Sequence, residues 1–298
     1  MHKHAYMIIA HNEFELLEYL VKALDDERND IYIHIDSKVK CFDVDKFKSL
    51  VKFSGIHFTN RISITWGDFS QVKCEMLLLK AAYENEDAKN PYSYFHLISG
   101  VDLPIKTNDE IYSFFEENNG KEFIHYSSNE ADSKDEDRIK YYHLFRKKRN
   151  MPNKIMANIL FRIQKHLPVN RLKGKSITVR KGCNWFSITH NLAEYILGRE
   201  DEINKMFNYS YCCDEIFLQT IVENSDFKTS LFLDNCNNNH YACARLIDWK
   251  RGNPYVFKKE DYELLISSKC MFARKFSMKT DKDIIRMIIS HISKGETV

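Results

Sequence analysis

Two strand patterns around one helical pattern, all within the first 36 residues, constrain the fold most. Residues 5–10 form a continuous apolar run, which is typical of a strand covered on both faces. Apolar residues recur at helical spacing from position 16 to position 24, and residues 31–36 carry a second strand pattern. This order predicts a parallel strand pair, and such sheets bind ligands at the carboxyl ends of their strands. His11 and Asn12 follow the first strand, and Asp36 ends the second.

Asp36 has two interpretations. An acid at the end of a second strand commonly accepts a hydrogen bond from a ribose hydroxyl group. An aspartate that forms a turn would occupy the same place equally well. Both interpretations stay open on this residue alone.

Two further strands are predicted over residues 56–59 and 94–98, with a helix over residues 70–84 between them. The later strand ends in Ser99 and Gly100, which Asp102 and a proline-fixed turn follow. Small residues at a strand end allow the backbone to approach a ligand closely, with the acid beside it. We therefore expect Gly100 and Asp102 at a binding site.

Asp102 lacks the second acid that a metal-dependent nucleotide-sugar site would need. A hard cation takes several oxygen ligands, which such sites supply from an Asp-x-Asp arrangement. The sequence has an Asp-x-Asp at Asp43-Val44-Asp45, but it precedes a short amphipathic stretch and is interpreted as a helix cap. Asp102 therefore has no partner of the kind that such a metal site needs.

Two adjacent acids, Asp214 and Glu215, precede an apolar stretch with helical spacing. The pattern predicts a helix in which Asp214 is the N-cap or a first-turn residue and Glu215 lies in the first turn. A carboxylate held ionised there by the helix dipole suits a general base. The alternative is that both acids only cap the helix.

A long basic stretch holds no acid at all between Arg138 and Lys181, directly after an acidic one over residues 130–137. Within the basic stretch, apolar residues from position 155 to position 167 lie at helical spacing. One interpretation is a solvated helix packed on the core. The other is a basic amphipathic helix at an anionic membrane surface or over a lipid-linked phosphate acceptor.

Charge, cysteines and the N-terminus restrict the class of protein. The net charge of +2 gives no argument for nucleic acid, and no known nucleic-acid module accompanies the basic stretch. The eight cysteines are single apart from Cys212 and Cys213, without a CxxC pair, so their spacing indicates neither a zinc site nor a redox motif. No signal-peptide layout or bilayer-spanning run is present. We therefore expect a cytoplasmic protein with free thiols.

Two aromatic segments complete the pattern. Trp185 follows Gly182 at the start of an aromatic strand pattern, and Trp249 precedes a basic pair and a tight turn. Trp249 on its own is interpreted as a core residue, with stacking on a sugar ring as the alternative.

Six motifs in order resemble one family of glycosyltransferases. Together they are similar to the core-2/I-branching β-1,6-N-acetylglucosaminyltransferase and peptide O-xylosyltransferase family, in particular its short bacterial members. The likeness extends from about residue 5 to residue 276. The motifs are IIAHN (8–12), IHID (33–36), LISGVDLPIKT (97–107), GCNWF (182–186), CDEIF (213–217) and FARKF (272–276).

The resemblance implies a fold and an activity. The fold class is α/β, a GT-A type glycosyltransferase fold with a Rossmann-like central mixed sheet flanked by helices. We expect residues 1–298 to form a single GT-A domain, in which about 138–181 are a basic insertion that is mobile or faces a membrane. The reaction implied is inverting, metal-independent transfer from a UDP-sugar, with GlcNAc or xylose as the sugar, to a saccharide acceptor in polysaccharide biosynthesis. No cofactor is implied, and the protein would be cytoplasmic or peripheral at the inner face of the membrane.

The resemblance also assigns roles by position. Glu215 matches the catalytic base, and Lys275 matches a cation that neutralises the departing diphosphate together with an upstream arginine, taken as Arg251, with Lys250 or Arg274 as substitutes. The positions that match the donor pocket are His11, Asp36, Gly100 and Asp102. Those expected near the sugars are Trp185, Asp214 and Trp249.

Two other classes of function remain open. One is a catalytically inactive UDP-sugar or carbohydrate-binding protein. The other is a scaffold at the membrane surface that uses the basic stretch. Neither needs the acid and the cation that Glu215 and Lys275 supply.

Overall fold

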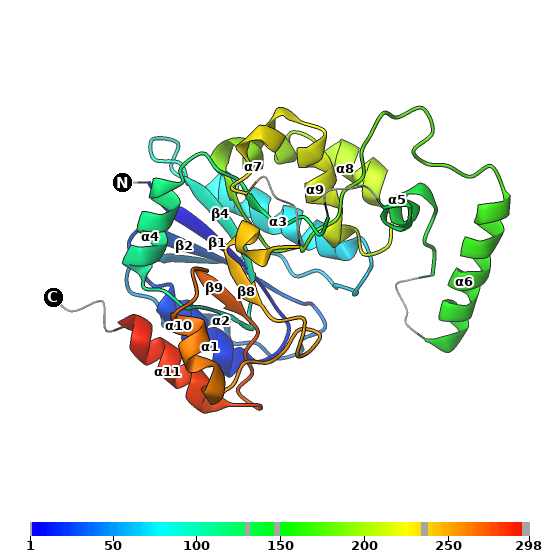
Figure 1. Cartoon of the computed structure of the whole chain (residues 1–298). Coiled ribbons are helices and arrows are strands. Elements are labelled where there is room, and N and C mark those ends of the chain that lie inside the picture. The colour runs from blue at the N-terminus through cyan, green and yellow to red at the C-terminus, as the bar shows by residue number, and fades with distance from the viewer. Residues whose placement is uncertain (1, 129–131, 146–149, 234–237, 294–298) are drawn as a thin grey trace.

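A six-stranded mixed sheet forms the centre of the computed structural model, which describes residues 2–128, 132–145, 150–233 and 238–293. Its order is β3-β2-β1-β4-β7-β6 (Figure 1). The first four strands along the chain run parallel, and β7 is antiparallel to both β4 and β6. The strands are β1 (His4–Ala10), β2 (Asn29–Ile35), β3 (Gly55–Phe58), β4 (Tyr94–Ser99), β6 (Phe123–Ile124) and β7 (Phe186–Thr189).

Helices cover both faces of this sheet. Side chains alternate along each strand, so Met7 packs against one face cluster while Tyr6 and Ile8 pack against the other. One face is covered by α1 (Phe14–Ala23), α2 (Val44–Lys48), α4 (Asn108–Glu117), α10 (Tyr262–Ile266) and α11 (Lys282–Ile292). The other is covered by α3 (Ser70–Asn85), α7 (His190–Leu197), α8 (Glu200–Phe207) and α9 (Phe217–Glu223). The predicted Rossmann-like central mixed sheet flanked by helices is confirmed.

A small second sheet begins where β4 ends. It consists of β5 (Asp102–Pro104), β9 (Phe272–Arg274) and β8 (Arg245–Ile247), in the order β5-β9-β8. The fully buried Arg245 joins the two sheets, because its guanidinium donates to the Ser187 hydroxyl at 2.8 Å and to the Leu97 carbonyl at 3.1 Å. The C-terminal segment 272–276 is thereby held beside the carboxyl end of β4.

Local signals predicted many of these elements. Asp43 caps α2 by accepting from the Lys46 amide, as expected, and Thr107 and Glu110 form a capping box at α4. The strand β6 is short, with only Phe123–Ile124 in the sheet.

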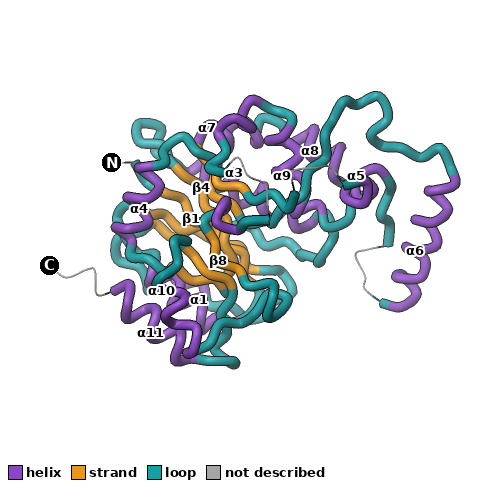
Figure 2. The backbone as a smooth tube through the Cα atoms, viewed as in Figure 1, coloured by secondary structure: helices purple, strands orange, loops and turns teal. Residues whose placement is uncertain are grey.

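Two helices stand apart from the sheet. Figures 1 and 2 show α5 (Ser133–Lys140) leading toward α6 (Met151–His166), which lies at the edge of the molecule away from the strands. The helical pattern predicted within the basic stretch is confirmed. Contacts to α6 come from α5 and from the segment after it. Lys165 Nζ lies 2.7 Å from Asp137 Oδ2, and the rings of Tyr141 and Phe161 lie 5.5 Å apart.

Candidate active site

The carboxyl edge of the parallel strands brings three predicted donor-pocket residues together. The amide of Asp36 donates to the Ala10 carbonyl and that of Gly100 donates to the Ile9 carbonyl, so both residues border the end of β1. His11 follows β1 directly, and its pKa is lowered by desolvation, with the charges of Asp36 and Arg274 among the further influences. His11 therefore lies within electrostatic reach of both β2 and β9.

Asp36 forms a turn of its own. Its Oδ1 accepts from the Lys38 amide two residues on at 2.8 Å, and Oδ2 accepts from the Ile64 amide at 3.3 Å. This is the turn-forming interpretation, which is confirmed. A contact of Asp36 with a ribose hydroxyl stays a prediction.

Gly100 is required by close packing between strands. A Cβ at this position would lie 2.9 Å from the Ala10 Cβ, closer than two such carbons pack. The close approach expected of Gly100 is thus made to β1, and its contact with a donor stays a prediction.

Asp102 is a buried acid paired with Arg274. Its Oδ1 lies 2.7 Å from Arg274 Nη1, and its Oδ2 accepts from the Ser99 amide at 2.8 Å. Burial raises the pKa of this carboxyl, and the Arg274 charge opposes that rise. The Arg274 guanidinium also stacks 4.4 Å from the ring centroid of Trp185. Asp102 and Trp185 together hold Arg274 in place.

Lys275 and Arg251 differ in how their charges are compensated. Within the described residues, the half-buried Lys275 ammonium has neither a hydrogen bond nor an ion pair. Arg251 contacts two carboxylates, Asp248 at 2.5 Å and Asp261 at 2.6 Å, and its guanidinium covers the Tyr255 ring. Two acids more than offset the single charge of Arg251. A contact of Lys275 with a diphosphate stays a prediction.

Glu215 lies in a tight turn before the helix, not inside it. Cys213–Glu215 form the 3-10 turn η1, and α9 begins only at Phe217 after Ile216, which provides no side-chain cap. The predictions that Asp214 caps this helix and that Glu215 lies in its first turn are therefore wrong. The physical reason is that Cys212 adopts a left-handed conformation, with φ of 47°, which turns the chain before the helix starts.

Arg138 from α5 fixes the Glu215 side chain. Its Nη1 lies 2.9 Å from Glu215 Oε2, and the carboxylate is 38% exposed. Oε1 has no hydrogen bond within the part of the chain that the structure describes. A carboxylate held by one oxygen and open at the other has the geometry that a general base needs.

Asp214 points into the protein beside a second buried acid. Its Oδ2 accepts from the Gln71 amide group at 2.7 Å, while Oδ1 has no partner among the described residues. Desolvation raises the pKa of Asp214 to about 7, with a further contribution from Glu215. The Glu75 carboxyl is also buried, and its pKa is raised well above its usual range by burial and then by Asp214. A direct contact of Asp214 with a sugar stays a prediction.

This burial predicts a pH-dependent stability effect of Asp214→Asn. The raised pKa means that the folded protein binds more protons than the unfolded chain from about pH 4 to about pH 7, so stability falls as pH rises through that window. Asparagine removes the charge and keeps an acceptor for Gln71. The variant is expected to be more stable than the parent at pH 8 by about 2 kcal/mol. Urea unfolding at pH 5 and pH 8 measures the difference, which should shrink at pH 5; an equal difference at both values would contradict it.

The two tryptophans lie in different environments. Trp185 is buried beneath Arg274, whereas Trp249 is 50% exposed. The interpretation of Trp249 as a core residue is therefore wrong, because its indole faces solvent 6.5 Å from the His240 ring. Contacts of either indole with sugars stay predictions.

One segment connects the acid to the cations. The Gly182 amide donates to the Glu215 main-chain carbonyl at 2.9 Å. Three residues later, the Trp185 ring packs against the guanidinium of Arg274, which precedes Lys275 in the chain. A Cβ at Gly182 would lie 1.7 Å from the His125 carbonyl oxygen, so only glycine allows this path. The segment 182–186 thus links the candidate base to the candidate diphosphate site.

Two features of the site were missed by sequence reasoning. Arg138 was assigned to the basic stretch as a whole, and nothing local marked it as the partner of an acid 77 positions away. His125, Cys183 and His240 also meet in space, although none of them belongs to a metal-ligand spacing in the sequence.

Comparison with known proteins gives relatives along almost the whole chain. Rat xylosyltransferase 2 is 24% identical over 307 residues, which cover 97% of this chain and 33% of the rat protein. Human xylosyltransferase 2 is 23% identical with the same coverage, and mouse xylosyltransferase 1 is 22% identical over 97% of this chain and 30% of its own length. This chain spans about a third of the length of these curated relatives.

A solved structure and a family model were also matched. The structure is the apo form of mouse xyloside xylosyltransferase 1, with a TM-score of 0.36 and 9% identity over 92% of this chain and 97% of that chain. The family model is described as Core-2/I-Branching enzyme and matches residues 4–267. Because that match covers most of the chain and contains Glu215, Arg138 and the strands that carry the donor-pocket residues, this protein belongs to the Core-2/I-branching enzyme family of glycosyltransferases.

Proposed function

We propose that this protein is a GT-A type glycosyltransferase that moves GlcNAc or xylose from a UDP-sugar to a saccharide acceptor, with inversion and without a divalent metal in the reaction. The observation that carries the proposal is the link through 182–186 between an open carboxylate at Glu215 and an uncompensated cation at Lys275. His11, Asp36 and Gly100 border the carboxyl edge of the parallel strands, which is where doubly wound sheets bind nucleotides.

Glu215 supplies the base in this proposal. Its Oε1 takes the proton of the acceptor hydroxyl, whose oxygen forms a bond to the anomeric carbon. The bond from that carbon to the UDP oxygen breaks, and its electron pair leaves with the diphosphate. Attack from the face opposite the leaving group inverts the anomeric centre. Arg138 keeps the carboxylate in position during the transfer.

Lys275 and Arg274 stabilise the departing diphosphate. Fixed cations placed where negative charge develops substitute for a metal ion. Arg274 is the better second cation than Arg251, because Arg251 is already held by two acids while Arg274 faces one. The Trp185 ring packs against Arg274 and orients the guanidinium. Because the ring is uncharged, it does not neutralise the cation.

A UDP-sugar transfer assay without divalent metal tests this function. The protein in EDTA is assayed with UDP-GlcNAc and UDP-xylose against a panel of saccharide acceptors, and the anomeric configuration of the product is read by NMR. We expect transfer that added Mn²⁺ changes by less than about twofold, because cations of the chain provide the charge stabilisation. Activity lost in EDTA and restored by Mn²⁺ would contradict the metal independence. Binding of UDP with no transfer to any acceptor would instead identify an inactive UDP-sugar or carbohydrate-binding protein.

The exposed face of α6 supports a place at a membrane, where a lipid-linked acceptor for polysaccharide synthesis would lie. Six apolar residues of α6 and the position after it are 46% to 68% exposed, and the charged residues between positions 138 and 181 are all cations. Apolar side chains at an anionic surface are stabilised by insertion, and the flanking cations by the headgroups. No helix within the described ranges combines the length and apolarity that crossing a bilayer requires. The six residues are Met151, Ile155, Met156, Ile159, Ile163 and Leu167.

Replacing Ile159 with glutamate tests the membrane contact. The change places a negative charge in the middle of the exposed stripe and is expected to weaken binding to phosphatidylglycerol vesicles about tenfold or more. Phe53→Glu is the matched control, since Phe53 is 66% exposed on another part of the molecule. Vesicle co-sedimentation measures both. Equal binding by the two variants, or no binding by the parent protein, would exclude α6 as a membrane-binding face.

A further inference from the structure

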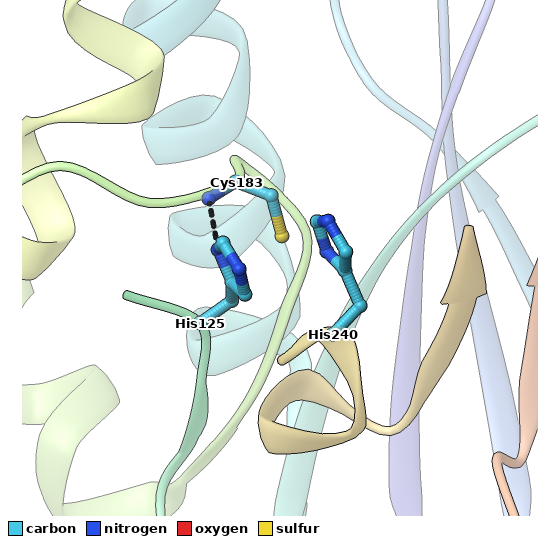
Figure 3. A group of neighbouring side chains, drawn as sticks. All are labelled: His125, Cys183 and His240. Carbon is cyan, nitrogen blue, oxygen red and sulfur yellow. Dashed lines mark hydrogen bonds between the residues drawn. The ribbon is translucent and has the colours of Figure 1, made fainter. Parts of the chain in front are cut away.

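Two histidines and a cysteine from distant parts of the chain converge beside the candidate active site. His125 follows β6, Cys183 lies in the segment 182–186, and His240 opens the 3-10 turn η3 (His240–Cys243). Figure 3 shows the Cys183 thiol next to the two imidazole rings. One ligand atom from each residue lies within 4.8 Å of the others.

The cluster is buried and incompletely hydrogen bonded. His125 is 2% exposed, and its Nε2 has no partner among the described residues, nor does His240 Nδ1. The two rings stack with centroids 4.1 Å apart and planes at 5°. A buried ring nitrogen without a partner costs stability, and coordination of a metal through His240 Nδ1 would satisfy that one.

Cys243 lies beside this group of three, and its thiol donates to the His240 carbonyl at 3.1 Å. Its Sγ lies 3.6 Å from Cys183 Sγ. Two sulfur ligands at about 2.3 Å from a tetrahedral zinc ion are separated by about 3.8 Å. The two sulfurs are therefore already spaced as a pair of zinc ligands, and two thiolates neutralise a divalent ion in a buried place.

We infer that His125, Cys183, His240 and Cys243 form a structural binding site for a soft divalent metal such as Zn²⁺. Loading releases the protons of the two thiols to solvent and leaves both histidines neutral. His125 Nδ1 now accepts from the Cys183 amide at 3.0 Å, so binding through this nitrogen exchanges that hydrogen bond for the metal. The Cys243 Sγ is not among the three atoms that already lie within 4.8 Å of one another, so loading requires the Cys243 side chain to rotate toward the two histidines.

A metal at this site would crosslink η3 to the segment 182–186, which connects Glu215 with Arg274 and Lys275. Gly182, which contacts the Glu215 carbonyl, precedes Cys183, and Trp185 follows two residues later. Four protein ligands leave no open position for substrate, so the role is structural and separate from the proposed reaction. The inference does not rest on that function, and the Glu215→Gln variant should bind metal like the parent.

Cobalt titration of the reduced, chelator-stripped full chain tests the site. We expect one equivalent of Co²⁺ to produce a sulfur-to-cobalt charge-transfer band, which one equivalent of Zn²⁺ abolishes by competition. Cys183→Ser and Cys243→Ser should each about halve its intensity, since the band scales with the number of bound thiolates and each variant keeps one. Cys41→Ser, at an exposed thiol, is the control and should leave the band unchanged.

A second measurement protects the test against misfolded variants. Zn²⁺ should raise the Tm of the parent protein by mass action, and His240→Ala, at a half-buried position in a turn, should lose most of that rise while unfolding cooperatively. The absence of a charge-transfer band in the parent would overturn the inference, as would a band of full intensity in either serine variant. If both proposals hold, the protein in EDTA should still transfer sugar, and its Tm should be lower than that of the zinc-loaded protein.

Discussion

Glu215→Gln is expected to lower the turnover of sugar transfer by about 10²–10⁴-fold while UDP binding stays near that of the parent. Glutamine has the shape of glutamate and keeps an oxygen facing Arg138 Nη1, which lies 2.9 Å from the carboxylate. It cannot accept the proton of the acceptor hydroxyl at Oε1. The loss should therefore appear in kcat, with little change in KM for the donor.

The measurement combines turnover with ligand binding. Transfer of radiolabelled sugar gives kcat, and calorimetry gives the Kd for UDP. Glu202→Gln is the control, because Glu202 is an exposed acid on α8 with a long contact of 3.9 Å to Arg199. Near-normal turnover of Glu215→Gln would eliminate Glu215 as the base, and lost UDP binding would show that the residue acts on the fold or the donor instead.

Lys275→Met is expected to lower kcat by about 10²–10³-fold, the usual effect of removing one group that stabilises developing negative charge. Within the described residues no acid is paired with the Lys275 ammonium, so in the proposed reaction its charge is available to the diphosphate. The loss should be smaller with a donor whose leaving group is a weaker base, because less charge then needs stabilisation.

Two further substitutions decide which cation assists Lys275. Lys275→Arg should recover part of the activity, since it keeps the charge. Arg251→Met should change kcat by less than about threefold, because Asp248 and Asp261 already offset the guanidinium. A loss in Arg251→Met as large as that in Lys275→Met would restore Arg251 as the diphosphate partner and remove Arg274 from that role.

Local patterns in the sequence predicted much of the fold. The apolar runs at 5–10 and 31–36 became β1 and β2, which pair in parallel from His4 with Asn29 to Ala10 with Ile35. Strand and cap signals are local, because they depend on the period of apolar residues and on hydrogen bonds within three or four positions. The cap predicted at Asp43 is of this local kind, and the structure confirms it.

The turn before α9 shows where local patterns failed. The acids Asp214 and Glu215 fit a helix start, but the left-handed Cys212 places them in a 3-10 turn instead. The Asp214 carboxylate, which was expected to cap a helix, instead accepts a hydrogen bond from the Gln71 side chain of α3. A contact between residues 143 positions apart has no signature in either neighbourhood.

The sequence by itself determined the alternation of strands and helices, the ordered motifs of the family, and the choice of Glu215 and Lys275 as candidates. Only the tertiary structure decided how charges are shared: Arg138 holds Glu215, Asp102 holds Arg274, and two acids hold Arg251. It also brought His125, Cys183 and His240 together from three separate segments. The physical reason is that ion pairing and metal coordination act between atoms a few ångströms apart, whereas a sequence records only the order in which those atoms are joined.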